Sequence, residues 1–238
     1  MTNRPANKNT AKKWPRADKD WYCETPRVVE QLFHGLAEHG AMFDGDVIWD
    51  PCCGRGNVLD VARRYGHLTF GSDLVDRGAN HRFAIANVLK LTQMPGPLRE
   101  ARVRGHQISV ISNTPYSYEP DIAERVICHL LDSFPLRRAA FILPISFLNG
   151  QDRWPRGKFA GRFKPSHTAI YRERPTMPPG HMIDELGAKA FKGGMQDYCA
   201  LVFTRPHRWR TETIWIPPGH FPDPPRPARA QPKEKASG

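Results

Sequence analysis

The sequence predicts an α/β fold in which a mainly parallel β-sheet carries helices on both of its faces. Short apolar segments typical of buried strands alternate with amphipathic helical segments between residues 21 and 216. Two of these strands run into turns that open helices, at residues 51–56 and 113–116. The chain has 238 residues, of which 39% are hydrophobic, so it can bury the core of one large domain without disulfide bonds.

The N-terminal elements are defined by local signals. Thr25 and Pro26 provide an N-cap and a first helical residue, and Gly40 ends that helix. A short buried strand is expected at residues 46–50. After the turn at 51–56, a second helix runs to Gly66.

The later strands follow at residues 68–73, 83–89, 107–112, 139–145, 168–171, 198–204 and 213–216, and the last three are expected to be partly antiparallel. A helix with an apolar face is expected after the turn at 113–116, and it carries Ile122, Val126 and Leu130. The segment 74–82 is shorter than the roughly 12 residues of a usual parallel crossover. Either its helix is a single turn or the strand at 83–89 is misplaced.

The chain is basic, and one segment carries much of the excess. The net charge is +11, and residues 153–174 contain seven Lys or Arg side chains against one acid. Such a segment favours contact with a polyanion. We expect a nucleic-acid-contacting segment at 147–175, in which Phe159, Phe163 and other aromatic rings stack on bases; alternatively, these two rings anchor a structural flap. The cations assigned to this contact are Arg153, Arg156, Lys158, Arg162 and Lys164.

Both ends of the chain are expected to be disordered. Residues 1–20 are basic with little to bury, and residues 217–238 are rich in proline. The five cysteines and ten histidines show no zinc-type spacing, so we expect reduced thiols and no metal. No apolar run approaches the length of a membrane span, and no signal peptide is evident. We therefore expect a cytoplasmic protein without a membrane partner, a monomer or weak dimer.

The turn after the first strand has the features of a nucleotide-type pocket. Asp50-Pro-Cys-Cys-Gly-Arg-Gly56 lies where a parallel sheet binds ligands, and its glycines let a ligand approach backbone amides at a helix start. Asp73, about twenty residues on, ends the second strand, where an acid can accept both hydroxyls of a ribose.

These residues resemble a known family. Asp50–Gly56 is similar to motif I (DPxCGxG) of S-adenosylmethionine-dependent methyltransferases, and Asn113-Thr-Pro-Tyr116 to the NPPY/F box of amino-group methyltransferases. Thr25-Pro26 resembles their motif X, and this order is that of γ-type adenine-N6 DNA methyltransferases. The segments at 146–153 and 193–203 are similar to small prophage-type adenine methylases. The resemblance implies a Rossmann-like class I methyltransferase fold with a seven-stranded sheet and an antiparallel C-terminal strand.

The resemblance also implies a set of site residues. Gly54, Gly56 and the backbone at 51–53 would hold the methionine part of S-adenosyl-L-methionine, Asp73 its ribose and Asn87 its adenine. Asp50 would orient the amino end of the cofactor, and Trp21, Tyr22 and Thr25 would close over its carboxylate. The cofactor-binding residues are therefore Tyr22, Thr25, Asp50, Pro51, Cys52, Gly54, Gly56, Asp73 and Asn87. Cys52 and Cys53 would pack beside the cofactor without acting as nucleophiles.

The catalytic residues expected from the second motif are Asn113, Thr114, Pro115 and Tyr116. An adenine amino group is a poor nucleophile because its lone pair is delocalised. The Asn113 side-chain oxygen and the Thr114 carbonyl can bind its two protons and direct the lone pair toward the methyl group, while Tyr116 stacks on the base. A base in a duplex must be flipped out to reach this site. Thr114 stands where the family most often has Pro, which raises the prospect of lower activity or a different amine.

The leading hypothesis is therefore methyl transfer to adenine N6 in DNA. RNA adenine and protein-glutamine amide transfer share an NPPY-type box and stay open, although the basic charge disfavours a purely protein substrate. Cytosine N4 is a further alternative, but that group usually has Ser at the Asn113 position. A weakly catalytic, cofactor-binding nucleic-acid module is the alternative from another class.

Overall fold

The computed structural model describes residues 17–79, 83–149, 158–191, 194, 196–207 and 210–220. Its strands are β1 (Asp46–Asp50), β2 (Leu68–Asp73), β3 (Phe83–Ile85), β4 (Gln107–Ser112), β5 (Arg138–Pro144), β6 (His167–Tyr171), β7 (Tyr198–Thr204) and β8 (Glu212–Ile216). Its α-helices are α1 (Pro26–Glu38), α2 (Asn57–Arg64), α3 (Gly96–Val103), α4 (Ile122–Ser133) and α5 (Gly180–Leu186). Short 3-10 turns lie at Asp18–Asp20, Val88–Lys90, Ile145–Asn149, Lys158–Ala160 and Gly187–Phe191.

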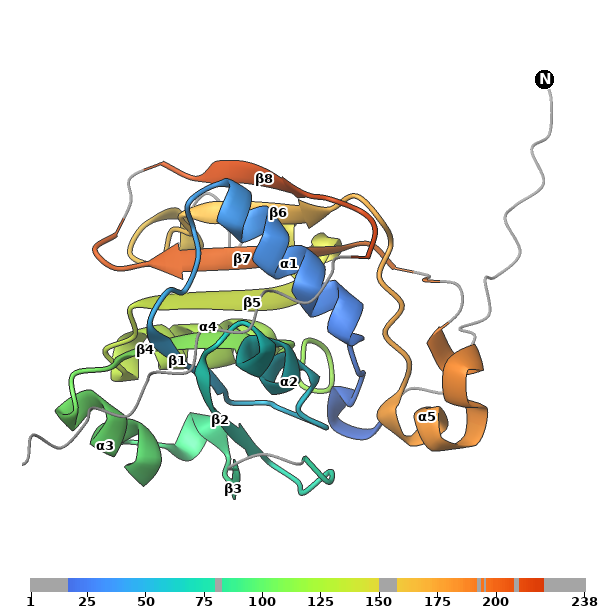
Figure 1. Ribbon diagram of the computed structural model, residues 1–238, viewed down its shortest axis with the longest axis horizontal. Helices are drawn as coiled ribbons and strands as arrows, with labels where there is room; N and C mark the ends of the chain where they lie inside the picture. Colours follow the sequence, from blue (N-terminus) through green and yellow to red (C-terminus); the bar gives the residue numbers. More distant parts are fainter. Residues whose placement is uncertain are drawn as a thin grey trace, which may run out of the picture.

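One mixed sheet of eight strands organises the fold (Figure 1), in the order β3-β2-β1-β4-β5-β7-β6-β8. The strands from β3 to β5 pair in parallel, β7 runs antiparallel to β5 and β6, and β8 pairs in parallel with β6. The expected Rossmann-like architecture with an antiparallel C-terminal strand is confirmed. The sheet has one strand more than the expected seven, because β8 joins its far edge beyond β6.

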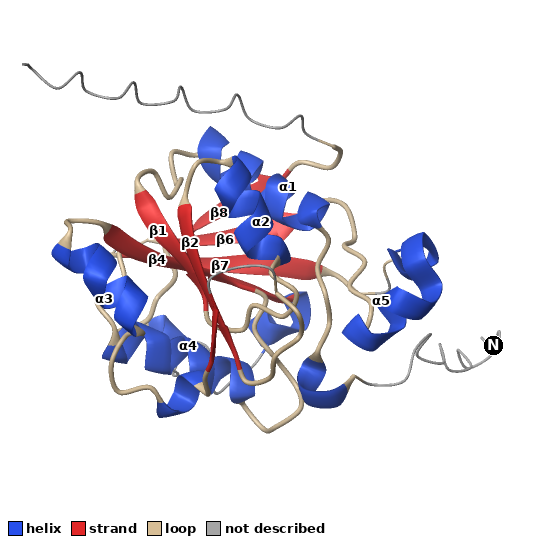
Figure 2. Cartoon of the chain, turned by 60° about the horizontal axis from the view of Figure 1, so that its bottom comes forward, coloured by secondary structure: helices blue, strands red, loops and turns tan. Residues whose placement is uncertain are grey.

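Helices cover both faces of the sheet (Figure 2), and each face has its own core. On one face α1 and α2 pack against residues such as Ile48 and Ile111, and on the other α3 and α4 pack against Trp49 and Val110. Central strands that are apolar on both faces belong to this arrangement. At the β8 edge, α1 approaches so closely that a Cβ at Gly35 would lie 3.3 Å from the Ile216 side chain.

The local signals for the first two helices operate as expected. The Thr25 side chain accepts a hydrogen bond from the Val28 amide at 3.4 Å, which caps α1, and Pro26 is its first residue. Gly56 takes the left-handed conformation with φ +89° directly before α2. A side chain at this position would strain the turn, so glycine is required there.

Three sequence-based boundaries need correction, namely those of the third strand, the N-terminal tail and the C-terminal tail. The third strand is only Phe83–Ile85, because the side chain of Asn87 caps the following 3-10 turn. It pairs in parallel with β2, and described residues 74–79 contain no helix. Residues 17–20, assigned to a disordered tail, belong to the fold, since Asp20 is buried.

The C-terminal boundary also moves, because the Gly219 carbonyl accepts hydrogen bonds from Arg27 and Gln31 of α1, at 3.0 Å each. The remainder of both expected tails lies outside the described residues. Within the described part of the chain, no helix combines the length and apolar character needed to span a membrane.

Candidate functional site

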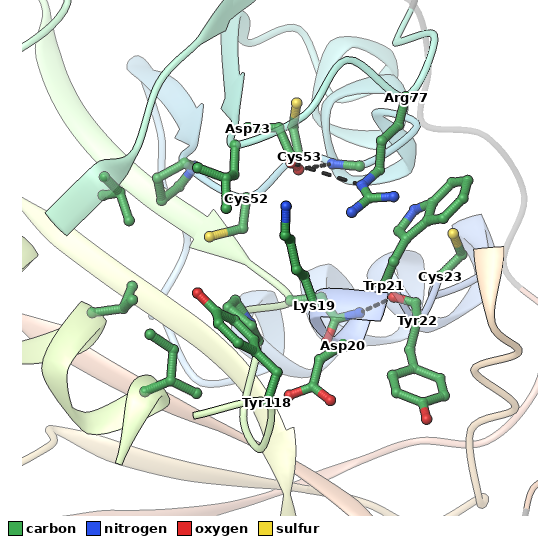
Figure 3. A pocket seen from close by; sticks show the side chains of 18 of the residues that line it. Lys19, Asp20, Trp21, Tyr22, Cys23, Cys52, Cys53, Asp73, Arg77 and Tyr118 are labelled. Carbon is green, nitrogen blue, oxygen red and sulfur yellow. Dashed lines mark hydrogen bonds and ion pairs between the residues drawn. The ribbon is translucent and has the colours of Figure 1, made fainter. Parts of the chain in front are cut away.

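A pocket opens at the carboxyl ends of β1, β2 and β4, where open parallel sheets bind ligands. Its wall is built from several loops and from the start of α4. Residues of segments 19–24, 51–57, 73–77, 86–89 and 113–118 line it, together with Ile122 and Val126. Figure 3 shows Lys19 extending into the space between Asp73 and Tyr118, and Trp21 beside Arg77.

The motif I turn is held against the end of β2 by the carboxylate of Asp73. Asp73 Oδ2 accepts a hydrogen bond from the Gly54 amide at 2.9 Å, and Oδ1 accepts one from the Val75 amide at 3.1 Å. The Arg77 guanidinium lies 3.8 Å from the same carboxylate. Gly54 has φ +50°, a conformation that glycine adopts without strain. Asp73 thus joins the two strand ends and still faces the pocket.

Asp50 has a different position from the one implied by the family resemblance. It is fully buried, and its Oδ1 accepts hydrogen bonds from the Cys52 amide at 3.1 Å and from the Ser112 hydroxyl at 2.7 Å. It does not line the pocket, and it ties the motif I turn to the end of β4. Burial, with the nearby Glu24 carboxylate adding to it, raises the pKa of Asp50 well above its usual range.

The thiols of the turn are also affected by burial. Burial is the main reason for the raised pKa of both Cys52 and Cys53, and the negative charge of Asp50 adds to it. A raised pKa keeps these thiols neutral at physiological pH, which fits the expectation that neither is a nucleophile. The described residues contain no group of three metal-ligating side chains that could hold an ion.

Asn113 lies at the second strand end, and its amide nitrogen is held by two acceptors. Nδ2 donates to the Tyr22 carbonyl at 2.9 Å and to Glu24 Oε2 at 2.9 Å. The oxygen of the same amide, Oδ1, is buried and has no hydrogen-bond partner among the described residues. An unpaired buried acceptor costs about 1–3 kcal/mol, so this atom is poised to receive a donor.

The other residues of the NTPY turn are held mainly by protein contacts. The Tyr116 ring packs on Tyr22 with centroids 6.0 Å apart and planes at 17°, and its hydroxyl lies 3.3 Å from that of Tyr198. Tyr116 does not line the pocket, whereas Tyr118 does. Thr114 is buried, and its hydroxyl has no partner in the described chain.

The residues predicted to bind the cofactor or to act in catalysis therefore divide into two groups. Those that line the pocket are Tyr22, Pro51, Cys52, Gly54, Asp73, Asn87, Asn113 and Pro115. Those that lie behind its wall are Thr25, Asp50, Gly56, Thr114 and Tyr116. Asn87 accepts a hydrogen bond from the Leu89 amide through Oδ1 at 3.0 Å, so its carboxamide is fixed at the pocket edge.

The segment before α1 contributes the predicted residues Trp21 and Tyr22 to the pocket, and also residues such as Asp20 and Glu24 that the sequence did not reveal. The Asp20 carboxylate accepts hydrogen bonds from the amides of Tyr116 and Ser117, and from the Ser117 hydroxyl at 3.1 Å. The Trp21 ring lies under the Arg77 guanidinium, 4.2 Å from the ring centroid. A Cβ at Gly180 would lie 2.1 Å from the same ring. This segment therefore closes one side of the pocket.

The basic segment is only partly described, because Arg153 and Arg156 lie outside the described residues. Lys158 lies 3.4 Å from Glu124, and Arg162 forms an ion pair with Asp132, so both cations face acids of α4. Phe159 and Phe163 are buried in the core. The expectation that these two rings stack on bases is wrong, and they anchor the segment as a flap.

The sequence matches no protein-family model and no curated protein. Among solved structures, the methyltransferase subunit of a type I restriction-modification system from Streptococcus thermophilus is similar over 82% of this chain, with a TM-score of 0.53 and 15% identity. The chain has the class I methyltransferase fold. It spans about half of that subunit, since the alignment covers 47% of it. A putative RNA methyltransferase from Pyrococcus horikoshii aligns with 74% of this chain and 83% of its own, with a TM-score of 0.48 and 12% identity.

Proposed function

We propose that the protein transfers a methyl group from S-adenosyl-L-methionine to the exocyclic N6 amine of adenine in DNA. The observation that carries this proposal is the unpaired, buried Asn113 Oδ1 at the edge of a pocket in a methyltransferase fold. An amine N–H would supply the partner that this oxygen lacks. The oxygen is shielded from water in this structure, so a substrate amine must part the residues packed around it.

The pocket residues fit the cofactor. The Asp73 carboxylate faces the pocket and retains lone pairs for ribose hydroxyls, and the Asn87 carboxamide lies beside apolar Val88 and Leu89, as an adenine site requires. When bound, S-adenosylmethionine would supply an activated methyl group with its sulfur as the leaving group, and the methylated amine would release its extra proton to water. Asn113 and the Thr114 carbonyl would hold the amine so that its lone pair points at the methyl group. Asn113 has no basic atom, so its contribution is orientation and electrostatics.

Tyr116 requires a revised role in this proposal. Its ring already packs on Tyr22, and its hydroxyl lies next to Tyr198. Tyr118 lines the pocket and follows the NTPY turn closely in the sequence, so it offers an aromatic ring for contact with an extruded base. We therefore assign base contact to Tyr118 and structural support of the turn to Tyr116.

Contact with DNA is proposed for the flap that includes Lys158, Arg162 and Lys164, and the adjacent Arg153 and Arg156. The Arg162 side chain is 74% exposed although it pairs with Asp132, so it can exchange that acid for a phosphate. Binding of duplex DNA should therefore weaken steeply with added salt. Binding that salt does not change would contradict a phosphate contact.

The test of the function is nucleoside mass spectrometry after purified protein is incubated with the cofactor and mixed-sequence duplex DNA. N6-methyldeoxyadenosine is expected, and Asn113→Ala should abolish it while calorimetry shows nearly unchanged cofactor affinity. Product on RNA alone, or on cytosine, would replace the proposed substrate. Cofactor binding without any methylated nucleoside would support the binding-module alternative.

A further inference from the structure

Glu24 is a buried carboxylate whose partner is a neutral amide. It is 6% exposed and lines the pocket, and its Oε2 accepts a hydrogen bond from Asn113 Nδ2 at 2.9 Å. Among the described residues no lysine or arginine forms an ion pair with it. Burial raises the pKa of Glu24, with the Asn113 hydrogen bond acting in the opposite direction. A carboxylate in this setting is costly to keep, and such groups cluster at functional sites.

The segment that carries Glu24 is fastened on both sides. The Cys23 amide donates to the Pro178 carbonyl at 2.9 Å, and the Glu24 carbonyl accepts from Asn57 Nδ2 at 2.7 Å. Thr25 then caps α1. The main chain that carries the Glu24 carboxylate is thus fixed relative to α2 by contacts that do not involve Asn113.

The two acceptors around Asn113 determine which way its amide faces. A primary amide has two N–H donors on one side and one oxygen on the other. Because the Tyr22 carbonyl and the Glu24 carboxylate take both donors, Oδ1 must face away from them. The flipped amide would place Oδ1 against two acceptors and would be repelled by both.

We propose that Glu24 is a positioning residue that locks the Asn113 amide with Oδ1 directed at the substrate amine. This inference rests on the proposed function, because it assigns Glu24 to the same reaction. If the Tyr22 carbonyl were the only acceptor, the Asn113 amide would be held by one hydrogen bond and could still rotate about it. The Glu24 carboxylate supplies a second acceptor, so that both N–H donors of Asn113 are held. Glu24 itself does not contact the amine.

The experiment compares Glu24→Ala and Glu24→Gln with the native chain. Single-turnover methyl transfer to DNA should fall about 10- to 100-fold in Glu24→Ala, since each factor of ten is the effect of about 1.4 kcal/mol on the barrier. Glu24→Gln retains an oxygen that can accept from Nδ2 and should recover most of the rate. Calorimetric affinity for S-adenosylhomocysteine should change less than about threefold in both variants, because Glu24 acts on Asn113.

Glu30→Gln is the matched control, because Glu30 is a largely covered glutamate of α1 that pairs with Arg64 outside the pocket. It should lose some stability and no transfer rate. Native transfer in Glu24→Ala would overturn the inference. A rate loss equal in Glu24→Ala and Glu24→Gln would also overturn it, because an oxygen that accepts from Asn113 Nδ2 would then not be what sustains transfer.

A second readout does not depend on the proposed function. The side-chain amide protons of Asn113, assigned by NMR through Asn113→Ala, should exchange slowly with solvent in the native chain and faster in Glu24→Ala. Unchanged chemical shifts and exchange in Glu24→Ala would overturn the positioning role even if the enzyme is active. Faster exchange without methyl transfer in the native chain would support the contact and refute the proposed function instead.

Discussion

Replacing Asp20 with alanine should destabilise the protein by about 2 kcal/mol. Its carboxylate accepts hydrogen bonds from the Tyr116 amide at 3.2 Å, from the Ser117 amide and from the Ser117 hydroxyl at 3.1 Å. Hydrogen bonds to a charged acceptor contribute about 1.5–3 kcal/mol each, although neighbouring contributions do not add. The loss is limited because a released segment regains about 1–2 kcal/mol of backbone entropy per residue.

Urea and thermal unfolding measure this effect. For a domain of this size, about 2 kcal/mol corresponds to a fall in Tm of about 4–8 °C. Asp20→Asn keeps one acceptor oxygen and should lose about half as much. Asp18→Ala is the matched control, because Asp18 is an exposed acid in the same 3-10 turn. Equal unfolding midpoints for Asp20→Ala and Asp18→Ala would refute a stabilising role of the Asp20 hydrogen bonds to Tyr116 and Ser117.

Three further predictions rest on buried polar groups. Burial raises the pKa of Asp50, and a raised carboxyl pKa gives stability that is lost as pH rises above the unfolded-state pKa of about 3.9 toward the folded-state value. Urea unfolding should therefore show Asp50→Asn gaining stability relative to the native chain as pH rises above about 4, and a pH-independent difference would contradict this. Thr114→Val should leave the unfolding free energy unchanged or raise it by about 1 kcal/mol, because the Thr114 hydroxyl is buried without a partner among the described residues. Ser112→Ala should lower the unfolding free energy by about 1–2 kcal/mol, because Asp50 loses a hydrogen-bond donor. A larger loss of stability in Thr114→Val than in Ser112→Ala would be inconsistent with these contacts. Burial raises the pKa of Cys23 and of Cys199 to about 12. At pH 8, both thiols of the folded protein should therefore react with dithiobis-nitrobenzoate more slowly than they do after unfolding. A rapid reaction in the folded protein, assigned to either cysteine by its serine variant, would count against its burial.

The parts of the fold that the sequence predicted are those encoded by neighbouring residues. Thr25 and Pro26 start α1, and Gly54 and Gly56 open the turn before α2, because capping and left-handed conformations are properties of a few adjacent residues. Asp73 follows from strand geometry, since parallel strands bring their carboxyl ends to one edge.

The parts that were missed depend on contacts between distant segments. Tyr116 faces Tyr22 and Tyr198, and its own segment gives no sign of either. Phe159 and Phe163 lie among basic residues without a helical or strand period, so the sequence could not distinguish rings that contact bases from rings that enter the core. Asp20 and Glu24 make their contacts with residues about ninety positions away along the chain.

The segment from Lys19 to Glu24 links the two halves of the pocket. Trp21 contacts the side that holds Asp73 and Arg77, which we assign to the cofactor, while Asp20 and Glu24 bind the turn that carries Asn113. Glu24 is fixed to α2 through Asn57, and Asp20 is fixed to the turn itself. A displacement of this segment would therefore open the cofactor side and remove the contact that orients Asn113 in the same motion.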